Sequence, residues 1–186
     1  MKKTQAKPKL FSSDFWDVNK ILSISAIFIS FMTFLVLIYQ TKILREQQLL
    51  SSMPYIDISN RGSYTPNFKI ILTNQGIGPA VLEEVNIFFE GKKTSFIDLV
   101  PFVFEKSDTI QNLEHLLHSN IYPGRLIPAG EIIPIFEVID DLNESIILKS
   151  EMDQLYVAGL EWEIIYSSVY KEKWRITHKS LAPEKL

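Results

Sequence analysis

The chain has 186 residues, a net charge of −3 and no cysteine, which excludes disulfides, zinc–thiolate sites and thiol nucleophiles. From residue 55 onward, 12 Lys and Arg stand against 19 Asp and Glu, a net charge of −7. A domain of that sign repels phosphate backbones, so no nucleic-acid partner is expected.

Residues 1–18 form a basic tail. The first 20 residues contain five Lys against two Asp, a net charge of +3. We interpret this charge as a topology signal; contact of the Lys side chains with anionic lipid headgroups is the alternative.

Residues 19–39 are predicted to be a transmembrane helix. Ile21–Tyr39 is a run of 19 residues without a charge, Pro or Gly, and as a helix it spans roughly 28 Å, close to the thickness of a bilayer's hydrocarbon core. Trp16 and Tyr39 lie where interfacial aromatic anchors are expected. The apolar run is longer than that of a signal peptide and no A-x-A-like site follows, so we expect an anchor that is not cleaved.

The charges that flank the span predict its orientation. Five Lys precede it, and only Lys42 and Arg45 follow it closely. Because positive charge is retained on the cytoplasmic side, we expect a bacterial inner (plasma) membrane protein with its N-terminus in the cytoplasm and its domain outside. A cytoplasmic domain is the alternative.

Small and hydroxyl-bearing residues line one side of the predicted span at spacings of three and four: Ser23, Ala26, Ser30 and Thr33. Such a stripe lets two helices approach closely in lipid, which favours self-association or packing against a partner's helix. Equally, the hydroxyls can bond to carbonyls of their own helix.

The helical pattern continues through a juxtamembrane segment, residues 40–53. Val36, Ile43 and Leu50 recur every seven residues, as in a short parallel coiled coil. A solvated spacer is the other interpretation. Pro54 disfavours helix at the residue before it, so the helix should end near Ser52.

Residues 54–179 are predicted to form an antiparallel β-sandwich domain. Strand-length segments alternate or run apolar between turn residues, without a βαβ rhythm. The clearest pair is a hairpin in which Trp162, Ile164 and Tyr166 share the core face and Trp174 and Ile176 lie in the return strand.

One helix is expected inside this domain, at about residues 107–119, with its apolar face formed by Ile110, Leu113, Leu116 and Leu117. Pro101 argues against a helix interior in residues 98–106, whose structure is left open. Lys92–Ile97 should return as a strand, residues 141–152 should form a short helix, and the tail 180–186 should fray.

The segment NFKIILTNQGIGPAVLEEVNIFF, residues 67–89, resembles the strand–turn–strand unit of bacterial Ig-like domains, with the CARDB-like, cell-adhesion-related type nearest. IPAGE and WEIIYSS further along are similar in kind. The resemblance covers about half of the domain and implies a fold, an Ig-like sandwich, without implying a particular function.

No motif points to a cofactor or a metal. Gly76-x-Gly78 lacks the third glycine and the βαβ unit of a dinucleotide site, so it is interpreted as a hairpin turn. His115 and His118 could share one side of a helix, but further ligands are missing, and we expect no metal.

Glu161 and Glu163 occupy alternate positions of one strand, about 7 Å apart. Paired carboxylates at that distance can act as acid and base in glycoside hydrolysis, but a solvated strand face is the favoured interpretation. No nucleophile elbow or Ser-His-Asp set is recognisable.

The leading hypothesis is a non-enzymatic, single-pass membrane protein. Its sandwich domain would bind or scaffold another component of the bacterial envelope, with lipid and a protein partner or second copy around the helix. The alternative is a defence-type sensor or effector whose transmembrane helix self-assembles and whose domain is cytoplasmic. A small envelope enzyme that uses Glu161 and Glu163 is the third hypothesis.

Overall fold

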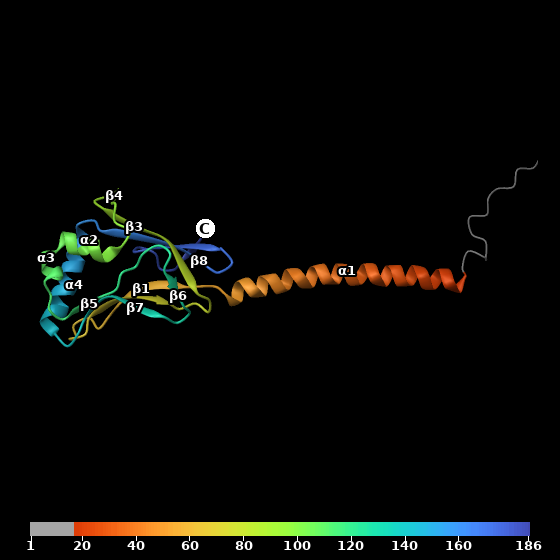
Figure 1. Ribbon diagram of the computed structural model, residues 1–186, viewed down its shortest axis with the longest axis horizontal. Helices are drawn as coiled ribbons and strands as arrows, with labels where there is room; N and C mark the ends of the chain where they lie inside the picture. The colour runs from red at the N-terminus through yellow and green to blue at the C-terminus, as the bar shows by residue number, and fades with distance from the viewer. Residues whose placement is uncertain (1–16) are drawn as a thin grey trace, which may run out of the picture. The chain divides into compact units, whose positions relative to one another are not determined.

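The computed structural model describes residues 17–186; the predicted anchor Trp16 and most of the predicted tail lie outside the described residues. The chain divides into two compact units, Met1–Gln47 and Gln48–Leu186. A single helix, α1 (Val18–Ser51), crosses this boundary, so that its last turn belongs to the second unit. Figure 1 labels the elements.

The second unit contains two antiparallel sheets. Sheet A has the strand order β1 (Ile56–Arg61), β2 (Lys69–Asn74), β7 (Ile132–Val138) and β5 (Leu116–His118). Sheet B has the order β10 (Glu184–Lys185), β9 (Lys173–Thr177), β8 (Glu161–Ser167), β3 (Ala80–Phe89) and β4 (Lys92–Lys93). A two-residue strand, β6 (Leu126–Ile127), pairs with the start of β3. The predicted long apolar helix and antiparallel β domain are confirmed at this level.

The core lies between the sheets because their strands alternate. In β8 the side chains of Trp162, Ile164 and Tyr166 are buried, and the residues that precede each of them in the strand, Glu161, Glu163 and Ile165, are more exposed. Tyr166 lies opposite Trp174 of β9, and the two rings stack with their centroids 5.9 Å apart. The predicted C-terminal hairpin is therefore confirmed, in its two strands and in its buried face.

Three helices cluster at one end of the two sheets, α2 (Leu99–Lys106), α3 (Asp108–Gln111) and α4 (Leu142–Val157) (Figure 1). Each starts at a side chain that accepts a backbone N–H: Asp98 for α2, Ser107 for α3 and Asp141 for α4. The short helix expected at residues 141–152 is present and extends to Val157.

Residues 98–106, left open by the sequence, contain helix α2, and Pro101 is not in its interior. Pro101 is the third residue of α2, in the first turn, where a backbone N–H has no partner within the helix. Asp98 supplies the cap, with its Oδ1 3.1 Å from the Val100 nitrogen. The proline therefore costs α2 no hydrogen bond.

The helix expected at about residues 107–119 is wrong. Helix α3 ends at Gln111, and Leu116–His118 form β5, which pairs with Val138, Glu137 and Phe136 of β7. Between them the Glu144 carboxylate accepts the backbone N–H groups of Glu114 and His115 at 3.0 and 2.9 Å. Tertiary hydrogen bonds outweigh the helical spacing of the leucines.

Two smaller expectations are also corrected. The return strand predicted for Lys92–Ile97 is limited to Lys92 and Lys93. The terminal residues 180–186, expected to fray, include β10, which pairs with Trp174 and Arg175 of β9.

Tyr166 joins the two sheets, and its burial predicts a stability that depends on pH. Its hydroxyl oxygen accepts the Ile56 N–H of sheet A at 3.3 Å, and burial raises the pKa of Tyr166 from 10.0 to about 12. Between these values the unfolded chain loses the phenol proton while the folded chain keeps it, so the free energy of unfolding should fall as pH rises through this range. Tyr166→Phe should flatten this fall, which denaturant titrations from pH 8 to pH 12 measure.

The exposed Tyr170 provides the control for this prediction. Tyr170→Phe should leave the slope of stability against pH as it is in the native chain. Equal slopes for the native chain and Tyr166→Phe would contradict the assignment to Tyr166.

Candidate functional site

Helix α1 has 34 residues, and none of them is buried. It is about 51 Å long, more than a hydrocarbon core requires. Among the described residues it is the one helix long and apolar enough to cross a membrane. Its apolar side chains, from Ile21 to Tyr39, are exposed on every side.

The predicted small-residue stripe lies on α1, and two of its hydroxyls are satisfied within the helix. Ser23 Oγ donates to the Asn19 carbonyl and Thr33 Oγ1 to the Ile29 carbonyl, both at 2.8 Å. Ala26 and Ser30 lie between them at helical spacing. These bonds make the hydroxyls compatible with lipid or with a neighbouring helix.

The predicted heptad residues Val36, Ile43 and Leu50 are exposed, as is Tyr39. The helix continues without a break through Gln40–Ser51, as the sequence predicted, which adds about 18 Å of helix beyond Tyr39. The seven-residue spacing keeps the three apolar side chains on one side of that segment.

A buried asparagine at the end of β2 organises the loops beside the start of β1. Asn74 Oδ1 accepts the N–H groups of Tyr55 and Gly76, both at 3.1 Å. Its Nδ2 donates to the carbonyls of Gly78, Ile127 and Pro128 at 2.9–3.2 Å. Sequence analysis missed this role, although Asn74 opens the N-x-G-x-G-P-A turn and lies where a polar residue interrupts an apolar strand.

The same turn closes around the backbone that leaves α1. Ile77 and Gly78 donate their N–H groups to the Met53 carbonyl at 3.1 and 3.3 Å. A Cβ on Gly78 would lie 2.7 Å from the Ser52 Cα and closer still to the Ser52 carbonyl. The predicted turn is therefore also a clasp, which we call the Asn74 clasp: residues 74–79 and 127–130 around Ser52–Tyr55.

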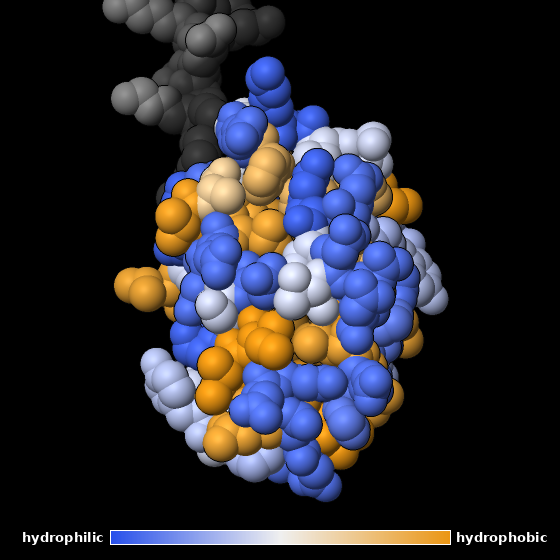
Figure 2. Space-filling model, turned by 90° about the vertical axis from the view of Figure 1, so that its left-hand side faces the viewer, coloured by the Kyte–Doolittle hydropathy of each residue, from blue (hydrophilic) through white to orange (hydrophobic). Residues whose placement is uncertain are grey.

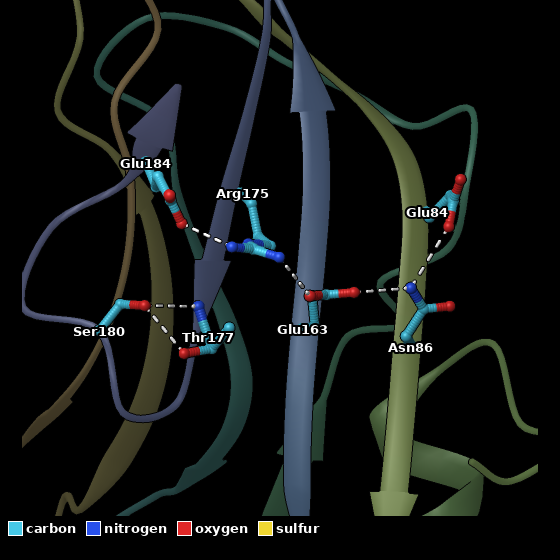
Figure 3. Close-up of polar contacts among 7 residues, drawn as sticks. All are labelled: Glu84, Asn86, Glu163, Arg175, Thr177, Ser180 and Glu184. Carbon is cyan, nitrogen blue, oxygen red and sulfur yellow. Dashed lines mark hydrogen bonds and ion pairs between the residues drawn. The ribbon is translucent and has the colours of Figure 1, made fainter. Parts of the chain in front are cut away.

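The outer face of sheet B carries a row of paired polar side chains (Figure 3). Glu163 on β8 accepts from Asn86 Nδ2 of β3 at 3.1 Å and lies 3.8 Å from the Arg175 guanidinium of β9. Arg175 also donates to Glu184 of β10 at 2.6 Å, and Asn86 Nδ2 lies 3.3 Å from Glu84. The row crosses four strands and ties the edge strand β10 to the sheet.

Glu161 and Glu163, the predicted acid–base pair, each form a salt bridge, Glu161 with Lys179 and Glu163 with Arg175. Glu161 accepts a hydrogen bond from Lys179, and this bond lowers the pKa of the Glu161 carboxyl. A general acid near neutral pH needs the opposite shift. The pair therefore has the arrangement of a salt-bridged sheet surface.

The three histidines lie apart from one another. His115 Nδ1 is 3.4 Å from Glu144, His118 of β5 packs edge-on against Phe104 of α2, and His178 stacks on Tyr156. Burial lowers the pKa of His178. Within residues 17–186, no three His, Cys, Asp or Glu side chains are grouped so that they could hold a metal ion.

A groove of about 480 Å³ follows the solvent-facing side of α4. Its apolar wall is formed by Ile146, Val157, which is 90% exposed, and Tyr64, which is 78% exposed and has a φ of 65°. Lys149 lies 5.9 Å from the Tyr64 ring and pairs with Asp153 at 2.5 Å. Figure 2 views the domain from this end and shows apolar side chains exposed among hydrophilic ones.

Comparisons with known proteins add no relative: no family model, no curated protein and no solved structure matches the chain.

Proposed function

We propose that this protein is a single-pass membrane protein of a bacterial inner membrane whose β-sandwich is a non-enzymatic binding or scaffold module. The observation that carries the proposal is the exposure of α1, because a run of 19 uncharged residues exposed on all sides is stable only where lipid surrounds it. The basic residues before the span favour a cytoplasmic N-terminus and a domain outside the cytoplasm.

Binding is favoured over catalysis by what the domain's surface offers. Glu161 and Glu163 are held in salt bridges on an open sheet face, whereas the groove along α4 presents apolar side chains around one ion pair. A concave apolar strip with few polar groups suits a partner segment better than it suits an acid–base reaction.

The finer fold assignment belongs to the same proposal. Two antiparallel sheets packed around one core, together with the N-x-G-x-G-P-A turn, support an Ig-like sandwich. The exposed stripe Ser23, Ala26, Ser30 and Thr33 and the heptad Val36, Ile43 and Leu50 support contact of α1 with a second copy or with a partner's helix.

Alkaline extraction and a reporter fusion test the proposal. The full chain should stay in the membrane pellet at pH 11, and a C-terminal reporter that is active only outside the cytoplasm should be active. A control with Leu35→Lys and Val36→Lys places two charges in the span, which should release the chain into the supernatant. Extraction of the native chain would contradict membrane insertion, and activity of a cytoplasm-only reporter would contradict the orientation.

A further inference from the structure

Strand β1 lies at the edge of sheet A, and among the described residues its partner is β2 on one side only. It pairs with β2 along its full length, from Ile56 opposite Asn74 to Arg61 opposite Lys69, without a register shift. Natural edge strands are usually blocked by a proline, a bulge or a covering segment, because a free edge is a template for pairing. The six residues of β1 contain no proline and no bulge.

The ladder with β2 determines which backbone groups of β1 face the open edge. Gln75 donates its N–H to the Tyr55 carbonyl at 2.7 Å, and the Ile56 N–H is bonded to Tyr166 rather than to β2, so Tyr55 and Gln75 occupy a hydrogen-bonded position of the ladder. In an antiparallel ladder such pairs recur at every second residue, which assigns Asp57, Ser59 and Arg61 to bonds with β2. The N–H and carbonyl groups of Ile58 and Asn60 therefore point to the open edge.

The side chains of β1 carry charges in a self-complementary order. Asp57, Ser59 and Arg61 alternate with Ile58, which packs against the core, so all three lie on the outer face of the sheet. Asp57 and Arg61 are equally far from Ser59 and opposite in charge. Arg61 forms no salt bridge within the described part of the chain.

We propose that β1 pairs antiparallel with β1 of a second copy, with Ser59 opposite Ser59 at the two-fold axis. In this register Ile58 of each copy exchanges hydrogen bonds with Asn60 of the other, which uses the N–H and carbonyl groups of both residues in each strand. Asp57 of each copy lies opposite Arg61 of the other, so that two ion pairs form across the join. A shift by one residue would turn the core side chains outward, and a shift by two would separate the charges.

The pairing joins sheet A of the two copies into one sheet. The contact is isologous: each pair of residues away from the two-fold axis occurs twice, once on each side of the axis. Its charge complementarity favours a second copy over an unrelated strand, because β1 itself supplies both members of each ion pair. The inference does not require α1 to be in a membrane, so it stands or falls separately from the proposed function.

The cysteine-free chain allows a direct test with single cysteines. The full chain carrying Ser59→Cys, purified in mild detergent, should form a covalent dimer on mild oxidation, because residues opposite each other at a non-hydrogen-bonded site have Cα atoms about 4.5 Å apart, within disulfide reach. Ser63→Cys is the matched control; it is more exposed, but in the proposed register it lies roughly 27 Å from its counterpart. Equal yields at the two positions would overturn the pairing.

Charge exchange in the Ser59→Cys background tests the register. Asp57→Arg or Arg61→Asp alone places like charges opposite each other twice and should lower the dimer yield roughly tenfold. The double variant Asp57→Arg with Arg61→Asp should restore it. Far-ultraviolet circular dichroism checks that each variant is folded, and a folded double variant that stays at the yield of the single variants would overturn the register.

Discussion

Gly78→Ala should destabilise the sandwich domain by about 3 kcal/mol, because the added methyl group has no room at the Asn74 clasp. The new Cβ would meet the backbone of Ser52, with the Ser52 Cα at 2.7 Å, and backbone atoms cannot rotate away as side chains do. Denaturant unfolding of the full chain in detergent, followed by tryptophan fluorescence, measures the change, since Trp162 and Trp174 are buried in the core.

The expected loss of stability is opposite in sign to the usual effect of replacing glycine by alanine. Gly78 has no positive φ, and at such positions alanine usually stabilises a protein by restricting the unfolded chain. Ile77→Ala is the control, because that side chain is 68% exposed in the same loop and should change stability by less than about 0.5 kcal/mol. A Gly78→Ala variant as stable as the native chain would show that the clasp is loose.

Asn74→Ala should cost about 4 kcal/mol of unfolding free energy. The substitution leaves two N–H groups and three carbonyls without their side-chain partner in a region where Asn74 itself is fully buried. Each unsatisfied buried group costs about 1–3 kcal/mol, and water that enters the new cavity recovers part of this. The same fluorescence titration gives the value.

One further variant tests the donor half of the Asn74 amide, and a second variant is its control. Asn74→Asp keeps an acceptor for Tyr55 and Gly76 but faces the carbonyls of Gly78, Ile127 and Pro128 with a carboxylate, and should be at least as damaging as alanine. Asn86→Ala is the matched control: this asparagine is also buried, but its partners are the carboxylates of Glu84 and Glu163, which water can reach, and the loss should be near 1 kcal/mol. Similar losses at the two asparagines would contradict a special role for the clasp.

The strands were predictable where a single face of an element is buried. Alternation alone placed Trp162, Ile164 and Tyr166 on the core face of β8 and paired this strand with Trp174 and Ile176. The apolar run of α1 was equally clear, because nineteen uncharged residues without Pro or Gly predict a helix long and apolar enough to cross a membrane. Such patterns reflect whether each side chain is buried or exposed, and they can be recognised without knowing the rest of the chain.

The helices between β4 and β5 were not predictable in the same way. The leucines after Ile110 have helical spacing. The backbone N–H groups of Glu114 and His115 bond instead to the carboxylate of Glu144, thirty residues along the chain from Glu114, and the chain continues as β5. Pro101 argued against a helix interior but could not show whether residues 98–106 are helical. A proline is tolerated in the first turn of a helix, and the cap at Asp98 places Pro101 in that turn.

Of the candidate site residues, those on α1 could be chosen from spacing because a helix face is a local property. Their partners are not local and stay a prediction. Asn74 was missed because its role depends on Ile127 and Pro128, more than fifty residues away, and the open edge of β1 follows from the strand order of sheet A. Patterns within one segment do not carry that information.

The strand order also determines when the domain can fold during synthesis. Val85 of β3 pairs with Ile164 of β8, and Ile70 of β2 pairs with Phe136 of β7, so the centre of each sheet joins segments far apart in the chain. Strands that follow one another in the chain pair at four places, β1–β2, β3–β4, β8–β9 and β9–β10. Because distant pairing waits for both segments and closes long loops slowly, sheet B cannot assemble until β8 has left the ribosome. Most of the chain must therefore be synthesised before the core between the two sheets can be completed.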